Sequence, residues 1–359
     1  MSYNIGSNNW NTTKDSVIGR ILEHTPEVLC LHEAGGPKLT YLETTLTNYR
    51  LLQTFGSNPS QTATHIFIQN SIDVLDSGFV KTDTYVGYTG LDRFVNWAKF
   101  AYNNVSFLVY ASHFVSTYGA NADSAVIGQY RHANTLVQLM DLHTAYNLPQ
   151  IACGDFNADS IKAVMQFLLH QTPITYNANT ITNPIVMDDS WYLANPNTQK
   201  PATSIIGFGS AAIDWILVSA NTNINEAIID NQGINGNGDY PSDHLPLQIT
   251  LNLTSVTSIF EKSNNLSLQL SPNPFQDYIH CEITLQNPEG VFIQVHDTEG
   301  RLVKSKYLKE NSTGKYKFTM DLSNMAAGIF LYCIRTSQEQ KTGLIIKSEV
   351  LQGGCKPNL

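Results

Sequence analysis

The sequence has little of what marks a membrane-spanning or a disulfide-rich protein. Its 359 residues include five cysteines, an odd number with no pair spaced as in a zinc knuckle, so no dense disulfide framework is expected. No apolar run reaches about 18 residues, which excludes a membrane-spanning helix. Residues 1–4 lack the basic and apolar segments of a signal peptide. Charged residues make up 14% and hydrophobic residues 42%, which is typical of a folded chain.

Negative charge is concentrated in the first part of the chain. Residues 1–260 carry 10 Lys and Arg against 20 Asp and Glu, a balance of −10, whereas residues 261–359 balance at +1. An acidic first domain argues against broad electrostatic binding of a polyanion. It does not exclude phosphate chemistry, because a bound divalent cation reverses the local field.

The length favours two domains, and the sequence pattern changes between them. Residues 1–252 alternate short apolar strands with helical stretches, including a helix expected over about residues 124–146. Residues 253–266 are rich in Thr, Ser and Asn and are typical of a linker. Residues 267–348 show strand signals separated by turns at short intervals, which predicts a small β-sandwich. Residues 349–359 form a tail.

Four cysteines fall in expected strands. Cys30 and Cys153 lie in buried strands and are interpreted as small apolar residues. Cys281 and Cys333 are assigned the core-facing parity of their strands, the second together with Ile329 and Leu331. Packed thiols are therefore expected, and a disulfide between Cys281 and Cys333 stays open.

Polar side chains that can bind metal or move protons occur where apolar strands stop. Strand ends and the loops beyond them are where layered α/β folds build their sites. The strand ends in question are Val28-Leu29-Cys30-Leu31 before His32 and Glu33, Phe107-Leu108-Val109-Tyr110 before His113, Ile151-Ala152-Cys153 before Asp155 and Asn157, residues 213–218 around Asp214, and the loop of residues 231–238 before Asp243 and His244. The repetition is more informative than any single motif.

Together these residues fit metal-assisted phosphoester hydrolysis. A divalent cation such as Mg²⁺, held by carboxylate and amide oxygens, neutralises the phosphate charge and stabilises the leaving oxygen, and Mn²⁺ or Ca²⁺ are alternatives. The expected metal ligands are Glu33, Asn4 and Asp243. The remaining residues are the expected catalytic groups: His244 activates water, Asp214 orients its ring, Asp155 and Asn157 position the water, and His113 donates to a phosphate oxygen or the leaving group.

Each residue also has a purely structural interpretation. Asp155 and Asn157 suit a turn, Glu33 a surface carboxylate, Asp243-His244 a helix cap before Pro246, and His113 a core histidine. His32 is interpreted as structural. Five further histidines match no motif and are expected at the surface or in packing: His24, His65, His132, His143 and His170.

The blocks that carry these residues resemble the endonuclease/exonuclease/phosphatase superfamily, and they occur in the family's order. Gly154-Asp155-Phe156-Asn157 is identical to the most diagnostic tetrapeptide, and His32 stands where the family more often has Gln. The other blocks are Ser2-Tyr3-Asn4-Ile5, residues 28–34, Ser112-His113-Phe114, Ile213-Asp214-Trp215-Ile216-Leu217-Val218-Ser219 and Ser242-Asp243-His244-Leu245-Pro246.

This resemblance implies an α/β (α+β) four-layer sandwich, in which two packed β-sheets are flanked by helices. The family's metal, water and phosphate roles fall on the residues assigned above. Arg93, in Asp92-Arg93…Trp97, stands where family members often carry an Arg, so it is expected either to contact phosphate or to form a surface ion pair.

The tail resembles a second family, the C-terminal sorting domain of the type IX secretion system. Its features include Ser271-Pro272-Asn273-Pro274-Phe275, Val295-His296-Asp297 and Ala327-Gly328-Ile329-Phe330-Leu331-Tyr332. Such domains address a cargo for release or surface attachment, so the secretion machinery is an implied partner and a secreted or cell-surface location is expected. That route normally begins with a signal peptide, which residues 1–4 do not show.

Three functions remain after this reasoning. The first is a secreted Mg²⁺-dependent phosphodiesterase, a monomer that acts on nucleic acid as a nuclease. The second keeps the chemistry on a phospholipid such as sphingomyelin or on an inositol phosphate, although the Trp-Cys-Asp-Arg stretch of inositol phosphatases is replaced by Ala212-Ile213-Asp214-Trp215. The third is a non-catalytic binding module, which predicts the loss of site residues, and none is lost.

Overall fold

The computed structural model describes residues 1–6, 9–52, 62–103, 105–117, 122–176, 178–205, 211–220, 222–233, 239–252, 266–285, 291–297, 302–308, 313–335 and 340–348. The chain forms two compact units, Met1–Val256 and Thr257–Leu359. The expected linker, apart from its last residue, and the tail at 349–359 lie outside the described residues. The described helices include none with the length and apolar character that a bilayer crossing requires.

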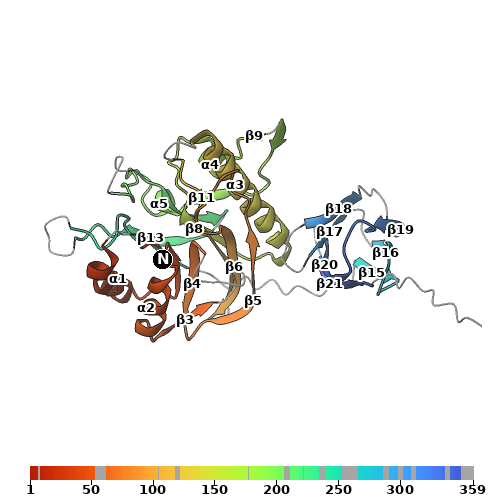
Figure 1. The fold of residues 1–359 in the computed structure, drawn as a ribbon, viewed down its shortest axis with the longest axis horizontal. Coiled ribbons are helices and arrows are strands. Elements are labelled where there is room, and N and C mark those ends of the chain that lie inside the picture. Colours follow the sequence, from red (N-terminus) through yellow and green to blue (C-terminus); the bar gives the residue numbers. More distant parts are fainter. Residues whose placement is uncertain are drawn as a thin grey trace, which may run out of the picture. The chain divides into compact units, whose positions relative to one another are not determined.

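The first unit contains two six-stranded mixed sheets (Figure 1). The first sheet has the order β13-β14-β1-β2-β4-β3, with β1 (Ser2–Asn4), β2 (Val28–His32), β3 (Tyr49–Leu52), β4 (Thr64–Gln69), β13 (Ile224–Ile229) and β14 (Leu247–Leu251). The second has the order β11-β12-β8-β7-β6-β5, with β5 (Asp73–Lys81), β6 (Phe94–Tyr102), β7 (Val105–Ser112), β8 (Gln150–Asp155), β11 (Met187–Asp189) and β12 (Asp214–Ser219). A small hairpin pairs β9 (Ile174–Tyr176) with β10 (Asn179–Ile181).

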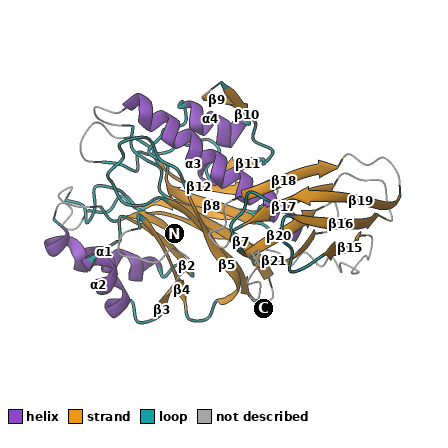
Figure 2. Cartoon of the chain, turned by 45° about the vertical axis from the view of Figure 1, so that its right-hand side comes forward, coloured by secondary structure: helices purple, strands orange, loops and turns teal. Residues whose placement is uncertain are grey.

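Helices cover the outer faces of both sheets, with α1 and α2 on one side and α3 and α4 on the other (Figures 1 and 2). Their bounds are α1 (Trp10–His24), α2 (Pro37–Thr45), α3 (Ala122–His143) and α4 (Ala163–His170), and the short α5 spans Ser190–Ala194. The helix expected over residues 124–146 corresponds to α3 and the single 3₁₀ turn Thr144–Tyr146 that follows it. These layers confirm the predicted four-layer sandwich.

Three apolar clusters hold the layers together, and single strands contribute to two of them. In β2, Leu29 and Leu31 pack toward α1 and α2, whereas Cys30 packs between the sheets. In β12, Trp215 and Leu217 face α3 and α4, whereas Ile216 and Val218 lie between the sheets. Because these strands are covered on both faces, they are continuous apolar runs in the sequence.

The covered strands bring their polar ends to one edge of the sandwich. Asn4 at the end of β1 pairs in register with His32 at the end of β2, and Asp155 at the end of β8 pairs with Asp214 at the start of β12. The parallel strands β7 and β8 run side by side up to Ala111 and Cys153, so Ser112 lies beside Gly154. The register thus collects residues that are far apart in sequence.

The second unit, taken by itself, consists of two antiparallel sheets packed on one core, as predicted. Their orders are β15-β16-β19 and β18-β17-β20-β21, with β15 (Leu266–Ser271), β16 (Tyr278–Leu285), β17 (Val291–His296), β18 (Leu302–Leu308), β19 (Gly314–Asp321), β20 (Gly328–Arg335) and β21 (Gln340–Lys347).

The core-facing parity assigned to the strand of Cys333 is wrong for Ile329 and Leu331, although Cys333 itself is buried at 3% exposure. The core-facing residues of β20 include Phe330 and Ile334, while Ile329 and Leu331, which share the parity of Cys333, are 49% and 44% exposed. Apolar residues occupy both faces of β20, so alternation alone did not identify the inner one. Cys281 belongs to the core, and no disulfide joins Cys281 and Cys333, both of which are buried.

Gly154 is required by the close approach of β7 to β8. A Cβ atom at this position would lie 1.8 Å from the carbonyl oxygen of Ser112, which belongs to the backbone and cannot rotate away. We expect Gly154→Ala to lower the free energy of unfolding by about 2 kcal/mol or more. Urea denaturation followed by circular dichroism measures the change.

Gly19 in α1 provides the matched control, because an added Cβ there meets nothing within 4 Å. Gly19→Ala should leave stability unchanged or raise it by about 0.5–1 kcal/mol through helix propensity. Equal effects of the two substitutions would contradict the assigned packing at Gly154.

Candidate active site

The predicted catalytic and metal-binding residues come together at the polar edge of the sandwich. Their side chains range from fully buried to exposed: Asn4, Asp155 and Asp214 are at most 1% exposed, whereas Glu33 is exposed. The groups that move protons are thus held in the protein, and the carboxylate expected to bind metal faces solvent.

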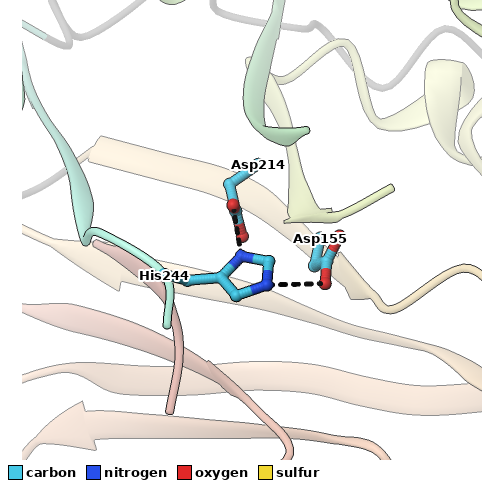
Figure 3. A group of neighbouring side chains, drawn as sticks. All are labelled: Asp155, Asp214 and His244. Carbon is cyan, nitrogen blue, oxygen red and sulfur yellow. Dashed lines mark hydrogen bonds and ion pairs between the residues drawn. The ribbon is translucent and has the colours of Figure 1, made fainter. Parts of the chain in front are cut away.

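His244 and Asp214 form a buried pair. The Nδ1 atom of His244 lies 2.7 Å from Oδ2 of Asp214, and the opposite ring nitrogen, Nε2, lies 3.8 Å from Oδ2 of Asp155 (Figure 3). The imidazole thus lies between two carboxylates, with one ring nitrogen directed at each. No helix begins at Asp243 or His244, so the helix-cap interpretation of this segment is wrong.

Backbone contacts fix both members of this pair. The hydroxyl of Thr203 accepts the backbone N–H of Asp214 at 2.9 Å, and the carbonyl of Thr203 accepts that of Leu245 at 2.7 Å. Ser242 accepts the backbone N–H of His244 at 3.2 Å, and its hydroxyl lies 2.7 Å from the carbonyl of Asn4. The loop that carries His244 is therefore tied to the start of β12 and to the end of β1.

The charges of the pair shift two pKa values in opposite directions. Burial opposes the charged form of His244, but the carboxylates of Asp214 and Asp155 outweigh it and raise its pKa to about 10. Burial also opposes the charge on Asp155, but His113 and His244 outweigh it and hold the pKa of that carboxyl well below its usual range. Without a metal ion, His244 is a cation beside an anionic Asp155.

Asp155, Asn157 and His113 form a second group next to this pair. The backbone N–H of Asn157, which has a positive φ of 50°, donates to Oδ1 of Asp155 at 2.9 Å. The side-chain amide of Asn157 donates to the carbonyl of Phe114 at 3.0 Å and lies 3.2 Å from Nε2 of His113. That ring nitrogen is 3.3 Å from Oδ2 of Asp155. Gly154 and Asp155 end β8, and Phe156 packs in the apolar core, so Asp155 and Asn157 are the residues of this segment whose side chains meet His113.

Glu33 and Asn4 place oxygen atoms beside Gly6. A Cβ atom on Gly6 would lie 2.5 Å from Oε2 of Glu33 and 3.0 Å from Oδ1 of Asn4, so both oxygens border one small space. The amide nitrogen of Asn4 donates to Asp155 at 2.9 Å and to Glu33 at 3.3 Å, which fixes the orientation of the amide. Glu33 adopts a positive φ of 58°.

Asp243 adds a carboxylate on the same side. Its backbone N–H donates to the carbonyl of Gly6 at 3.3 Å, and its side chain is half-buried. Burial raises the pKa of Asp243, and the like charge of Glu33 adds to the rise against the opposing effect of His244. The oxygens of Glu33 and Asn4 border one space at Gly6, and Asp243 is tied to the same residue through its backbone, so these three residues offer the oxygen ligands that a hard divalent cation prefers.

A second group of possible ligand atoms, on Asp155, Asp214 and His244, lies within 4.8 Å of one another. Oδ2 of Asp214 and both ring nitrogens of His244 are engaged within this group, whereas Oδ1 of Asp214 is buried without a hydrogen-bond partner among the described residues. A cation bound through Nδ1 of His244 or Oδ2 of Asp214 would have to break the buried histidine–carboxylate pair. The oxygens around Gly6 are therefore the better candidate metal site.

Arg93 lies beside the predicted site rather than in a surface ion pair. Its Nε donates to the hydroxyl of Tyr88 at 2.8 Å and its NH1 to the carbonyl of His113 at 3.4 Å, and no carboxylate in the described part of the chain pairs with it. Together with Glu33 and His113 it borders a cavity of about 450 Å³. The guanidinium is thus placed to meet a bound phosphate.

His32 lies beside the site, with its ring edge-on to that of His113 at a centroid distance of 5.8 Å, and its structural role stays a prediction. It is fully buried, its Nε2 lies 3.1 Å from the hydroxyl of Ser2, and its Nδ1 lies 3.3 Å from that of Thr64. Of the histidines assigned to surface or packing, His65, His132 and His143 are buried and His170 is exposed.

Sequence reasoning missed Thr203 and Lys38. Thr203 belongs to no motif, because its contacts depend on the fold of a loop. Lys38 is in the first turn of α2 and donates to the carbonyl of Ile5 at 2.9 Å. The only available signal was a basic residue close after Glu33, behind Gly35-Gly36-Pro37.

The raised pKa of His244 can be measured directly. In metal-free protein, NMR of the imidazole nitrogens should show His244 doubly protonated at pH 8, since its pKa is about 10. Asp214→Asn removes the neighbouring charge and should lower this pKa toward about 6.5. Asp188→Asn, on the edge strand β11, is the matched control and should leave the titration of His244 unchanged. An imidazole already neutral at pH 8 in the unsubstituted protein would contradict the assigned electrostatics.

Comparisons with known proteins agree with this geometry. Residues 1–244 match the model of the endonuclease/exonuclease/phosphatase family, and residues 269–348 match that of the secretion system C-terminal sorting domain. A comparison with curated proteins found no match.

Several solved structures share the fold of the first unit. An endonuclease/exonuclease/phosphatase from Bacteroides vulgatus has a TM-score of 0.56 at 19% identity, covering 70% of this chain and 97% of that one. A mannosyl-6-phosphatase from Bacteroides thetaiotaomicron has a TM-score of 0.53 at 18% identity, and the match covers 70% of this chain and 98% of that one. TDP2 from D. rerio, in complex with a single-strand DNA product, has a TM-score of 0.54 at 17% identity, and the match covers 70% of this chain and 97% of that one.

At these identities the structural likeness shows the fold alone. The family model covers well over half of the chain, and the sorting-domain model covers most of the second unit, which indicates secretion or a cell-surface location. The chain therefore belongs to the endonuclease/exonuclease/phosphatase family and carries a type IX secretion sorting domain behind its family domain.

Proposed function

We propose that this protein is a secreted, Mg²⁺-dependent phosphodiesterase that cleaves nucleic acid. The observation that carries the proposal is the convergence of a buried His244–Asp214 pair, an anionic Asp155 and the oxygens around Gly6 at one edge of the sandwich. These are the parts that hydrolysis of a phosphoester needs: a group to accept the proton of water, groups to position it and ligands for a cation.

The metal ligands in this proposal are Glu33, Asn4 and Asp243. When bound, Mg²⁺ would neutralise charge on the phosphate and stabilise the leaving oxygen. The proposal has one electrostatic requirement. His244 already carries both ring protons in the metal-free site, so it must release one before it can act as a base. Positive charge near Glu33 and Asp243 must therefore lower the pKa of His244.

The protein groups then divide the proton transfers. His244 accepts the proton of the attacking water at Nε2, and Asp214 stabilises the imidazolium that results through its contact with Nδ1. Asp155 and Asn157 hold the water in line with the phosphorus. His113 and Arg93, which border the cavity of about 450 Å³, contact the phosphate oxygens or the leaving group.

Fewer observations support a nucleic acid as the substrate than support phosphoester hydrolysis as the reaction. It is supported by the family, whose similar structures include D. rerio TDP2 with a single-strand DNA product. A small phosphate ester, such as a phospholipid headgroup, an inositol phosphate or a sugar phosphate, is the second candidate. It is favoured by the balance of −10 over residues 1–260 and by the similar mannosyl-6-phosphatase structure.

The sorting domain provides the location in this proposal. The secretion machinery would recognise the second unit, and the enzyme would act outside the cell, either released or attached to the surface. The first unit holds every proposed catalytic residue, so catalysis does not require the sorting domain.

The metal and histidine roles are tested together with bis-p-nitrophenyl phosphate. Hydrolysis should require Mg²⁺ and stop in EDTA, and His244→Ala should lower kcat by about a thousandfold, since general base catalysis contributes about 10²–10⁴. His170→Ala, at an exposed position at the end of α4, is the matched control and should keep full activity. Hydrolysis that persists in EDTA would contradict the metal site, and an active His244→Ala variant would contradict the assigned base.

The substrate is tested with a panel at equal enzyme and Mg²⁺ concentrations: plasmid DNA, single-stranded DNA, RNA, sphingomyelin, an inositol phosphate and mannose 6-phosphate. We expect kcat/KM to be highest for a nucleic acid, with cleavage lost in His244→Ala. If a small ester is preferred by tenfold or more, the nuclease assignment is wrong and the second candidate replaces it.

A further inference from the structure

Lys38 places a positive charge beside the oxygens assigned to the cation. It lies in the first turn of α2, and its Nζ donates to the carbonyl of Ile5 at 2.9 Å. Ile5 lies between Asn4 and Gly6, so this contact brings the ammonium to the backbone that borders the predicted metal site. The ring of Trp10, with its centroid 5.3 Å from Nζ, lies on another side of the group.

The surroundings of Lys38 leave its charge without a direct counter-ion. No carboxylate in the described residues forms an ion pair with Nζ within 4.0 Å, although the charges of Glu33 and Asp243 act on the ammonium from farther away. Burial lowers the pKa of Lys38, and the charges of Glu33 and Asp243 oppose that change. The ammonium therefore acts on the same two carboxylates that are assigned to the cation.

Lys38 also has donor capacity to spare. An ammonium has three N–H groups, and within the described part of the chain Nζ has one acceptor, the carbonyl of Ile5. The side chain is half-buried, so the remaining N–H groups can still reach a ligand. An anchored, partly exposed ammonium beside a phosphate-hydrolysing site is suited to bind a phosphate oxygen.

Building on the proposed function, we propose that Lys38 is a further positive charge of the active site, which binds the phosphate of the substrate and weakens the binding of the divalent cation to the free enzyme. Both effects follow from one charge. It repels a cation at Glu33 and Asp243, and it attracts the phosphate that arrives with its negative charge. A residue that only anchored α2 would have neither effect.

The experiment compares Lys38→Met with the unsubstituted full-length protein in two measurements. Binding of Mn²⁺ to the free protein is measured by electron paramagnetic resonance, and KM is measured with bis-p-nitrophenyl phosphate. We expect Mn²⁺ to bind about fivefold more tightly and KM to rise about fivefold. The reason is that the removed ammonium repels the cation and attracts the phosphate. Lys38→Arg keeps the charge and should leave Mn²⁺ binding unchanged.

Lys14→Met is the matched control. Lys14 lies on the neighbouring helix α1, with Nζ 4.5 Å from the ring centroid of Tyr41, and it has no recorded interaction with Glu33 or Asp243. It should change neither constant. If Lys38→Met does not fold, Lys38→Gln is measured by the same criteria, since its amide can still donate to Ile5.

The two proposals fail in different ways. If the unsubstituted protein binds Mn²⁺ and hydrolyses the ester but the neutral Lys38 variant shows unchanged or weaker Mn²⁺ binding, the role of Lys38 is wrong and the proposed function stands. An unchanged KM would likewise contradict the proposed contact between Lys38 and the phosphate. If the unsubstituted protein neither binds Mn²⁺ nor hydrolyses any ester of the panel, the proposed function itself is wrong.

Discussion

The site depends on the pairing of β8 with β12. This register puts Asp155 directly opposite Asp214 at the edge of the second sheet, where both carboxylates are buried. Two buried carboxylates on neighbouring strands are unfavourable unless a cation or hydrogen-bond donors compensate their charges. His244 supplies part of that compensation, because its two ring nitrogens are directed at the two carboxylates, and His113 and the amide of Asn4 add to it at Asp155. The catalytic pair thus also helps to make the pairing of these strand ends tolerable.

The first sheet contributes the opposite kind of electrostatics. Around Gly6 the carboxylate of Glu33 lies beside the amide of Asn4, Asp243 contacts Gly6 through its backbone N–H, and neither carboxylate forms an ion pair within the described residues. One edge of the sandwich therefore holds a compensated buried charge network next to an uncompensated, more exposed one. A dissociable cation is expected in the second, where its binding relieves repulsion between carboxylates without breaking buried hydrogen bonds.

Much of this could be predicted from the sequence, because strands covered on both faces are visible as apolar runs. The runs before Glu33, His113 and Asp155 each lie within a strand of the structure and end one or two residues before β2, β7 and β8 end. The predictions that failed concern single residues. Apolar residues on both faces of β20 concealed its core-facing side, so Ile329 and Leu331 were assigned to the core although they are exposed. Thr203 and Lys38 act through contacts with backbone atoms of other segments, which no spacing in the sequence encodes. The metal set, the individual catalytic roles and the domain boundaries remain predictions.

The central claim is that a divalent cation binds to the oxygens around Gly6 and not within the histidine–carboxylate network. Crystals of the protein soaked in Mn²⁺ would locate the ion by its anomalous scattering. We predict one strong peak within coordination distance of Glu33, Asp243 and the amide oxygen of Asn4, with the contact between His244 and Asp214 intact. A peak between Asp155, Asp214 and His244, or the absence of any peak near Glu33, would contradict this account of the site.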